Sequence, residues 1–177
     1  MSADQNTGFR VTYGVKESPE MGLGVFACET IKQGTIVWRH IPSRLVVHDE
    51  RSFKAAIKDM THDQIVYELT HSFGLADLPG CVISISDEGA LINHSSDANV
   101  ATNNFGPLET QLDVSSASYL QDVTNLLMSD RYALIATRDI ERGEEFTNNY
   151  GDEVSDPPFF TAMYELYDID DDFLDSN

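Results

Sequence analysis

The chain has 177 residues, 41% of them hydrophobic and 23% charged, a size and balance that suit one compact domain with a substantial core. Its 30 acidic residues outnumber 11 basic ones, and the formal net charge of −19 disfavours direct binding to nucleic acid because phosphates would be repelled. The 2 cysteines, Cys28 and Cys81, are too few for a zinc site or a disulfide framework.

The first 20 residues contain no apolar run of the kind found in signal peptides. No stretch of the chain approaches the roughly 20 apolar residues that a membrane-spanning helix needs. These observations predict an intracellular protein, nuclear or cytoplasmic, that has no membrane segment and keeps its thiols reduced.

The amino-terminal part of the sequence favours short β-strands. Residues 1–8 are polar, and we expect them to be flexible. Runs of β-branched and aromatic residues then predict strands over 9–13, 24–28, 35–38 and 45–47. Lys32-Gln33-Gly34 is typical of the turn between the second and third of these strands.

The next part favours helices. Apolar residues recur at helical spacing over residues 51–73. Thr61 and Gln64 have the spacing of a capping box, so we expect a second helix to begin there and Gly74 to end it. A strand over 81–85 is expected to follow.

The carboxyl-terminal part mixes both kinds of element. Residues 119–127 fit either a short amphipathic helix or a loop insertion, residues 132–136 fit a strand, and residues 141–144 fit a turn. Asp156-Pro157 is typical of a helix start, and the chain beyond it is acidic and aromatic. We therefore expect 153–177 to form a short helix and then a frayed tail.

Many short strands without a βαβ alternation predict a mostly-β, irregular α+β fold. The segment Gly22-Leu23-Gly24-Val25-Phe26-Ala27 formally matches a dinucleotide fingerprint, but neither the required preceding strand nor the following helix is predicted. The histidines show no metal-ligand spacing, so we expect no metal site; they are His40, His48, His62, His71 and His94.

Three segments carry a resemblance when they are taken together, in this order: residues 22–35, residues 91–100 with Asn93-His94-Ser95, and residues 133–152 with Asn149-Tyr150-Gly151. Residues 9–152 resemble a SET domain, the fold of the protein lysine methyltransferases. The resemblance implies several short strands in small sheets, a helical insert at 49–80, and a knot-like crossing of the segments that carry Asn93 and Tyr150.

The resemblance also implies S-adenosylmethionine as the cofactor. Its candidate contacts are Gly22, Leu23, Gly24, Asn93, His94 and Tyr150. Two glycines let backbone approach a ligand closely, and an asparagine amide can both donate to and accept from a zwitterion. Each has a structural alternative, namely a β-turn for the glycines, a capped turn for Asn93 and a half-buried core ring for Tyr150.

The implied activity is methyl transfer to the side-chain amine of a protein lysine, with Tyr150 lining the lysine channel as the catalytic residue. A basic protein or peptide, such as a histone, suits the acidic chain, although the charge alone also explains solubility. Phe159, Phe160 and Tyr164 are candidates for an aromatic lid on that channel, with core packing of an amphipathic helix as the alternative. The absence of zinc-binding flanks would allow a homodimer that completes the groove.

The chain departs from the family pattern at three places. Asn149 stands where many relatives have Asp, Ala98 stands where Pro is usual, and the strand from Cys81 lacks a starting aromatic residue. Tyr67, Tyr119 or Tyr132 are candidates to supply the missing channel wall. These departures leave two alternatives open: a SET-like binding module without transferase activity, and a methyltransferase acting on something other than protein lysine.

Overall fold

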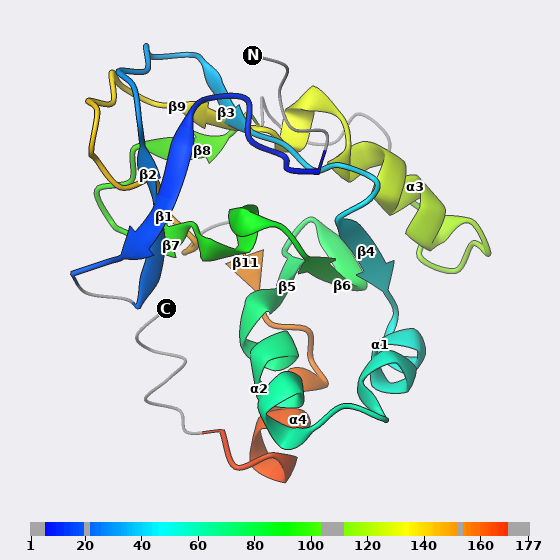
Figure 1. Ribbon diagram of the computed structural model, residues 1–177. Helices are drawn as coiled ribbons and strands as arrows, with labels where there is room; N and C mark the ends of the chain where they lie inside the picture. The colour runs from blue at the N-terminus through cyan, green and yellow to red at the C-terminus, as the bar shows by residue number, and fades with distance from the viewer. Residues whose placement is uncertain (1–5, 20–21, 104–111, 152–153, 170–177) are drawn as a thin grey trace. The chain divides into compact units, whose positions relative to one another are not determined.

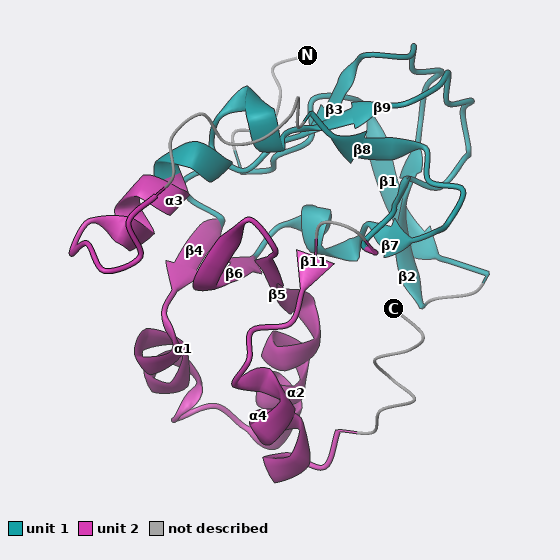
Figure 2. Cartoon of the chain, turned by 180° about the vertical axis from the view of Figure 1, so that it is seen from behind, with its two compact units in different colours: residues 1–44, 86–107, 125–150 teal, residues 45–85, 108–124, 151–177 magenta. Residues whose placement is uncertain are grey.

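The computed structural model describes residues 6–19, 22–103, 112–151 and 154–169. These residues form small β-sheets with a few helices (Figure 1), which confirms the predicted mostly-β α+β class. The chain divides into two compact units. The first comprises residues 1–44, 86–107 and 125–150, and the second residues 45–85, 108–124 and 151–177 (Figure 2).

The first unit begins with an antiparallel hairpin of β1 (Tyr13–Glu17) and β2 (Leu23–Ala27). The predicted strand over 9–13 is wrong, because β1 starts only at Tyr13. Arg10 donates its backbone N–H to Val37, whereas Thr12 accepts from Cys28. The chain therefore changes its pairing partner between these two residues, and the strand cannot run through them.

A five-stranded sheet follows in the order β3-β9-β8-β10-β7. Its strands are β3 (Ile36–Trp38), β7 (Asn93–His94), β8 (Val100–Thr102), β9 (Leu134–Ala136) and β10 (Thr147–Asn148). β10 lies between β7 and β8 and is parallel to both. Residues 95–99 connect β7 to β8, and β10, which comes from much later in the chain, lies between these two strands.

Close packing around Trp38 fixes one edge of this unit. The indole ring fits against Gly8 and Gly89, where a β-carbon on either glycine would overlap it. Asp87 accepts from the Trp38 indole N–H at 3.1 Å and from the Gly8 backbone N–H at 2.6 Å. Short 3₁₀ helices at Glu88–Leu91 and Asp130–Tyr132 complete the unit. Its close packing thus depends on two glycines that carry no side chain.

His40 makes the stability of this unit sensitive to acid. Burial lowers the pKa of His40 to about 4, and its ring lies edge-on to Trp38 with centroids 4.6 Å apart. The folded protein therefore binds this proton only at low pH, whereas an unfolded histidine titrates near pH 6.5. The contribution of the neutral His40 to the free energy of unfolding is therefore complete above about pH 6.5, and about 3 kcal/mol of it is lost as the pH falls toward 4.

This prediction is checked by comparing urea unfolding of the wild type with that of His40→Leu between pH 7 and 4.5. The difference between the two free energies isolates His40, because the other titrating groups are common to both proteins. Trp38, the single tryptophan of the chain, reports the transition by fluorescence. Parallel pH curves for the two proteins would contradict it.

The second unit contains an antiparallel sheet in the order β11-β5-β6-β4 with helices beside it. Its strands are β4 (Leu45–His48), β5 (Ser72–Leu75), β6 (Leu78–Ile85) and β11 (Val154–Ser155). Its helices are α1 (Glu50–Ile57), α2 (His62–His71), α4 (Phe160–Leu166) and the first part of α3 (Tyr119–Leu127). The helix at 119–127 is therefore the correct alternative for that segment.

The capping box predicted at Thr61 is confirmed, since its side chain accepts from the Gln64 backbone and Gln64 accepts from the Thr61 N–H. The predicted helix stop at Gly74 is wrong. α2 ends at His71, and Ser72 already begins β5. Gly74 has another reason to lack a side chain: a β-carbon there would press on the backbone of Ser155 in β11.

The core of the second unit lies between its helices and sheet. Eight buried residues form one cluster, which consists of Phe53, Ile57, Ile65, Leu69, Val82, Phe160, Met163 and Tyr164. α4 begins at Phe160 and not at the predicted Asp156-Pro157, because Pro157 accepts from the Phe160 N–H and closes a turn first. The predicted frayed tail and most of the predicted flexible amino-terminal segment lie outside the described residues.

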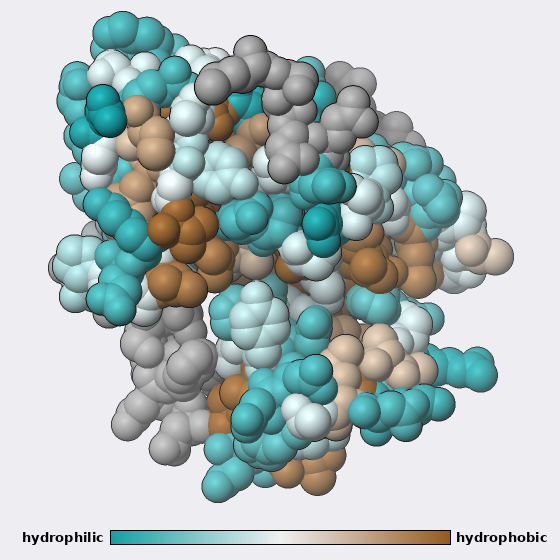
Figure 3. Space-filling view, in the orientation of Figure 1, coloured by the Kyte–Doolittle hydropathy of each residue, from teal (hydrophilic) through white to brown (hydrophobic). Residues whose placement is uncertain are grey.

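The surface is polar over much of the view in Figure 3, with smaller apolar areas between the hydrophilic ones. Among the residues that the structure describes, six large apolar side chains are exposed, namely Val15, Leu23, Val46, Tyr67, Val114 and Leu166. None of the described helices has the length and apolar character needed to cross a membrane.

Candidate active site

The predicted cofactor residues all lie in the first unit, on three segments that are remote in sequence. Gly22 to Gly24 lead into and begin β2, Asn93 and His94 form β7, and Tyr150 follows β10. β7 pairs with β10 through Thr147 opposite Asn93 and Asn148 opposite His94. The Asn93 side-chain amide donates to the Leu23 carbonyl at 3.2 Å. The structure therefore brings the three segments together.

The two glycines are required for different reasons. Gly22 has φ +69°, in the left-handed region, and apart from its chain neighbours no described residue has a heavy atom within 4 Å of the position that a β-carbon would take. Gly24 has ordinary backbone geometry, but a β-carbon there would overlap the Glu145 carboxylate and come within 3.1 Å of the Asn93 amide nitrogen. Gly24 thus makes room for a side chain of the protein itself.

Glu145 is a site residue that the sequence interpretation missed. Its Oε1 accepts from Asn93 Nδ2 at 2.6 Å, and its Oε2 accepts from Ser18 Oγ at 2.8 Å. Both Asn93 amide hydrogens are thereby engaged, one on this carboxylate and one on Leu23. A glutamate in the common turn sequence Gly-Glu-Glu gave no signal, since nothing local indicates which of the two neighbours points into the site.

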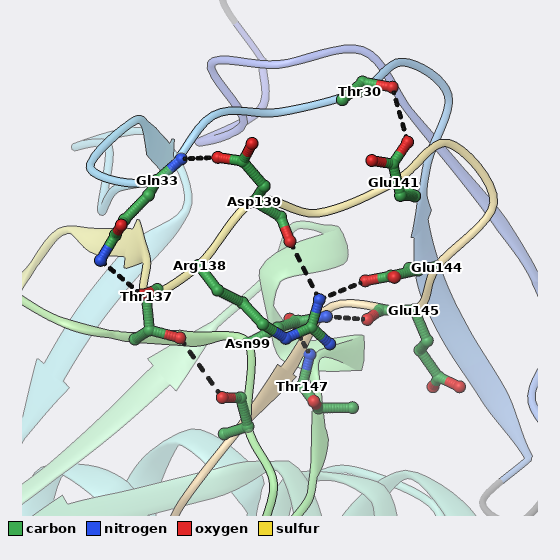
Figure 4. Close-up of polar contacts among 11 residues, drawn as sticks. Thr30, Gln33, Asn99, Thr137, Arg138, Asp139, Glu141, Glu144, Glu145 and Thr147 are labelled. Carbon is green, nitrogen blue, oxygen red and sulfur yellow. Dashed lines mark hydrogen bonds and ion pairs between the residues drawn. The ribbon is translucent and has the colours of Figure 1, made fainter.

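The buried side chain of Asn99 links the loop between β7 and β8 to the segment that leads into β10. It is 3% exposed, donates to the Glu145 carbonyl at 2.7 Å and accepts from the Thr147 N–H at 3.1 Å (Figure 4). The same figure shows the flanking polar contacts that join residues 30–33 to 137–141. A buried amide with both ends used in this way fixes the backbone that carries Glu145.

Replacing Asn99 by alanine should destabilise the protein by about 2 kcal/mol, because it leaves the partly buried Glu145 carbonyl and Thr147 N–H without their side-chain partner. The expected result is a lower urea midpoint with an unchanged m-value. Asn103 lies outside the buried crossing and serves as the matched control, so Asn103→Ala should change the midpoint far less. Equal effects of the two variants would contradict this role for Asn99.

Tyr150 is held at both ends. Its hydroxyl donates to the Ile92 carbonyl, and its backbone N–H donates to His94 Nδ1 at 3.1 Å. Burial raises the pKa of Tyr150 to about 12, so the phenol is neutral at physiological pH. While the Tyr150 hydroxyl donates its hydrogen to the Ile92 carbonyl, its oxygen still has lone pairs that can accept a hydrogen bond.

His94 contributes through its ring in this structure. Its Nδ1 accepts from Tyr150, which places the proton of the neutral ring on Nε2. The two rings are tilted at 48° with centroids 5.4 Å apart. The contact of the His94 backbone with adenine, which the resemblance implies, stays a prediction.

The aromatic residues proposed as a channel lid lie in the second unit. Phe160 is 0% exposed and Tyr164 is 6% exposed, and both belong to the core cluster of that unit, with Phe159 packed against it. The alternative of core packing therefore accounts for these rings. Of the other tyrosines considered for the channel wall, Tyr132 lies buried in the first unit, and Tyr67 and Tyr119 lie in the second.

The remaining departures from the family pattern are at Ala98, Asn149 and the strand that contains Cys81. The Ala98 carbonyl accepts from the Thr137 hydroxyl at 3.4 Å, and Asn149 is exposed. Cys81 is buried, and burial raises the pKa of its thiol to about 11, which suits a structural residue. Within the described part of the chain, no group of His, Cys, Asp and Glu side chains could hold a metal ion.

Comparisons with known proteins find one family model and similar solved structures. The family model described as "SET domain" matches residues 22–151. Among solved structures, the chain is similar to a crystal structure of a Plasmodium falciparum protein described as a candidate histone methyltransferase. The two are 17% identical with a TM-score of 0.46, over 81% of this chain and 96% of the other. Comparison with curated proteins finds no matching sequence.

Proposed function

Because this chain belongs to the SET domain family, we propose that it transfers a methyl group from S-adenosylmethionine to the side-chain amine of a protein lysine. The observation that carries the proposal is the meeting of the Gly22–Gly24 segment, Asn93 and Tyr150 within one unit. These are the residues expected to contact the cofactor and the acceptor amine, and they come from segments more than 50 residues apart.

The residues present fit an amino-acid-bearing cofactor. The Leu23 carbonyl, the Glu145 carboxylate and Asn93 form a polar group next to Gly22, whose Cα has open space beside it. When bound, S-adenosylmethionine supplies a methyl group on a cationic sulfonium. A positively charged ligand is favoured next to carbonyl and carboxylate oxygens.

Tyr150 would orient the acceptor amine. Its hydroxyl is fixed on the Ile92 carbonyl, so its oxygen can accept one N–H of the amine and direct the nitrogen lone pair toward the donor. Since burial raises the pKa of Tyr150 to about 12, its phenol stays protonated at neutral pH and does not act as a tyrosinate base. The amine would instead arrive neutral, because desolvation lowers the pKa of a lysine.

The charge of the protein supports a basic protein or peptide as substrate. The formal net charge of −19 would attract such a chain, with a rate that falls as salt is added. The second unit also has a hollow of about 350 Å³ beside α2 and the turn before it, lined among the described residues by Met60, Asp63, Gln64, Tyr67 and Glu68. An aromatic ring with carboxylates beside it suits a lysine or arginine side chain.

The direct test is calorimetric titration of the purified protein with S-adenosylmethionine, followed by a radiolabelled methyl-transfer assay on histones and on cell lysate. We expect saturable binding and labelling of protein lysine. Absence of binding would overturn the proposal, and transfer only to small molecules would replace the substrate class.

The second candidate function is a binding module that holds the cofactor or a basic peptide without turnover. Asn149 favours it, since many relatives have Asp at this position before the tyrosine. Binding of S-adenosylmethionine together with no transfer to any protein in the lysate would support this candidate over the enzyme.

A further inference from the structure

Glu145 differs from its neighbours in having no cationic partner among the described residues. In the described part of the chain, its two oxygens accept from the neutral groups of Asn93 and Ser18. The adjacent Glu144 forms an ion pair with Arg138 at 2.7 Å. Figure 4 shows the Glu144 carboxylate directed at that arginine and the Glu145 carboxylate directed away from it. A half-buried carboxylate held by neutral donors is a ready partner for a cation.

The place of this carboxylate is specific. It lies over the Cα of Gly24 and accepts from the Asn93 amide. It is therefore next to the residues that are expected to contact the methionyl part of the cofactor. Asn93 already uses its amide hydrogens on Glu145 and Leu23. A ligand carboxylate would therefore find no free Asn93 donor here, whereas an ammonium group would find acceptors.

Three acceptors of this kind converge. They are the Glu145 carboxylate, the Leu23 carbonyl and Asn93 Oδ1, to which no described residue donates. An ammonium group has three hydrogens to donate and no acceptor, so its needs match this set. A neutral amine would gain less, because it lacks the Coulomb attraction that an ammonium group has for the Glu145 carboxylate.

We propose that Glu145 is the counter-ion of the α-ammonium group of the cofactor, and that Asn93 and Leu23 orient this group beside it. The inference rests on the proposed function and adds the residue that recognises the charged amine. It also explains Gly24, because any side chain at this position would displace the carboxylate from Asn93.

The test compares two ligands on the full chain by calorimetry. S-adenosylhomocysteine carries the α-ammonium, and 5′-methylthioadenosine keeps the adenosine and thioether but has no amino-acid part. Glu145→Gln should bind S-adenosylhomocysteine at least tenfold more weakly than the wild type, and 5′-methylthioadenosine within twofold of it. Glu144→Gln makes the same charge change outside the site and should leave both affinities unchanged.

Each other outcome has a definite meaning. Equal affinity of wild type and Glu145→Gln for S-adenosylhomocysteine would overturn this inference and leave the proposed function standing. A parallel loss for both ligands would assign Glu145 a structural role and also overturn it. Failure of the wild type to bind either ligand would overturn the proposed function together with the inference.

A measurement on the wild type alone covers the case in which Glu145→Gln does not fold. The wild type should bind S-adenosylhomocysteine at least tenfold more tightly than its deaminated analogue, which keeps the carboxylate and lacks the ammonium. Equal binding of the two compounds would contradict the proposed contact.

Discussion

Replacement of Tyr150 by phenylalanine should lower kcat for methyl transfer by about a hundredfold, because the amine loses the group that aligns it with the donor. Binding of S-adenosylhomocysteine should change little, since phenylalanine keeps the ring that is expected to contact the cofactor, and this ligand lacks the transferring methyl group. The measurement is single-turnover transfer with a saturating protein substrate, together with calorimetry on the same preparation.

The variant also leaves the Ile92 carbonyl without its donor, so a loss of stability of about 1 to 3 kcal/mol is expected alongside the loss of rate. Tyr167→Phe, which removes a tyrosine hydroxyl in the second unit, is the matched control and should keep the wild-type rate. A wild-type rate in Tyr150→Phe would remove Tyr150 from the proposed role.

Replacement of Phe160 by alanine should destabilise the protein by about 3 to 5 kcal/mol. The ring is 0% exposed, and its centroid lies 5.2 Å from that of Phe53 and 5.8 Å from that of Tyr164. Removing it leaves a cavity among aromatic rings that cannot all move inward to fill it. Urea unfolding followed by circular dichroism measures the change.

Leu166 provides the comparison, because it lies on the same helix and is 73% exposed. Leu166→Ala should alter the free energy of unfolding by less than about 0.5 kcal/mol. A loss below about 1 kcal/mol in Phe160→Ala would contradict its place in the core and would reopen the alternative that this ring lines a substrate channel.

Local chemistry alone predicted the features that depend on a few neighbouring residues. The capping box of Thr61 and Gln64 lies within one helical turn, and the glycines at 34 and 143 adopt the positive φ values that their turns require. The cofactor segments were predicted from the resemblance to the family, and the structure joins Asn93 to Leu23 and Tyr150 to His94 through contacts that a motif cannot display.

Partners remote in sequence decided the rest. Nothing near Glu145 indicates that its carboxylate reaches Ser18, which is 127 positions away, and nothing near Gly24 indicates that the missing side chain is needed for that carboxylate. Likewise, no strand runs through Arg10 and Thr12, because Arg10 is bonded to Val37 and Thr12 to Cys28, which lie on different segments. Sequence determined which turns, caps and motif residues this protein has. Only the tertiary structure decided which side chain occupies which space, because exclusion and hydrogen bonding act between atoms that the chain brings together only when it is folded.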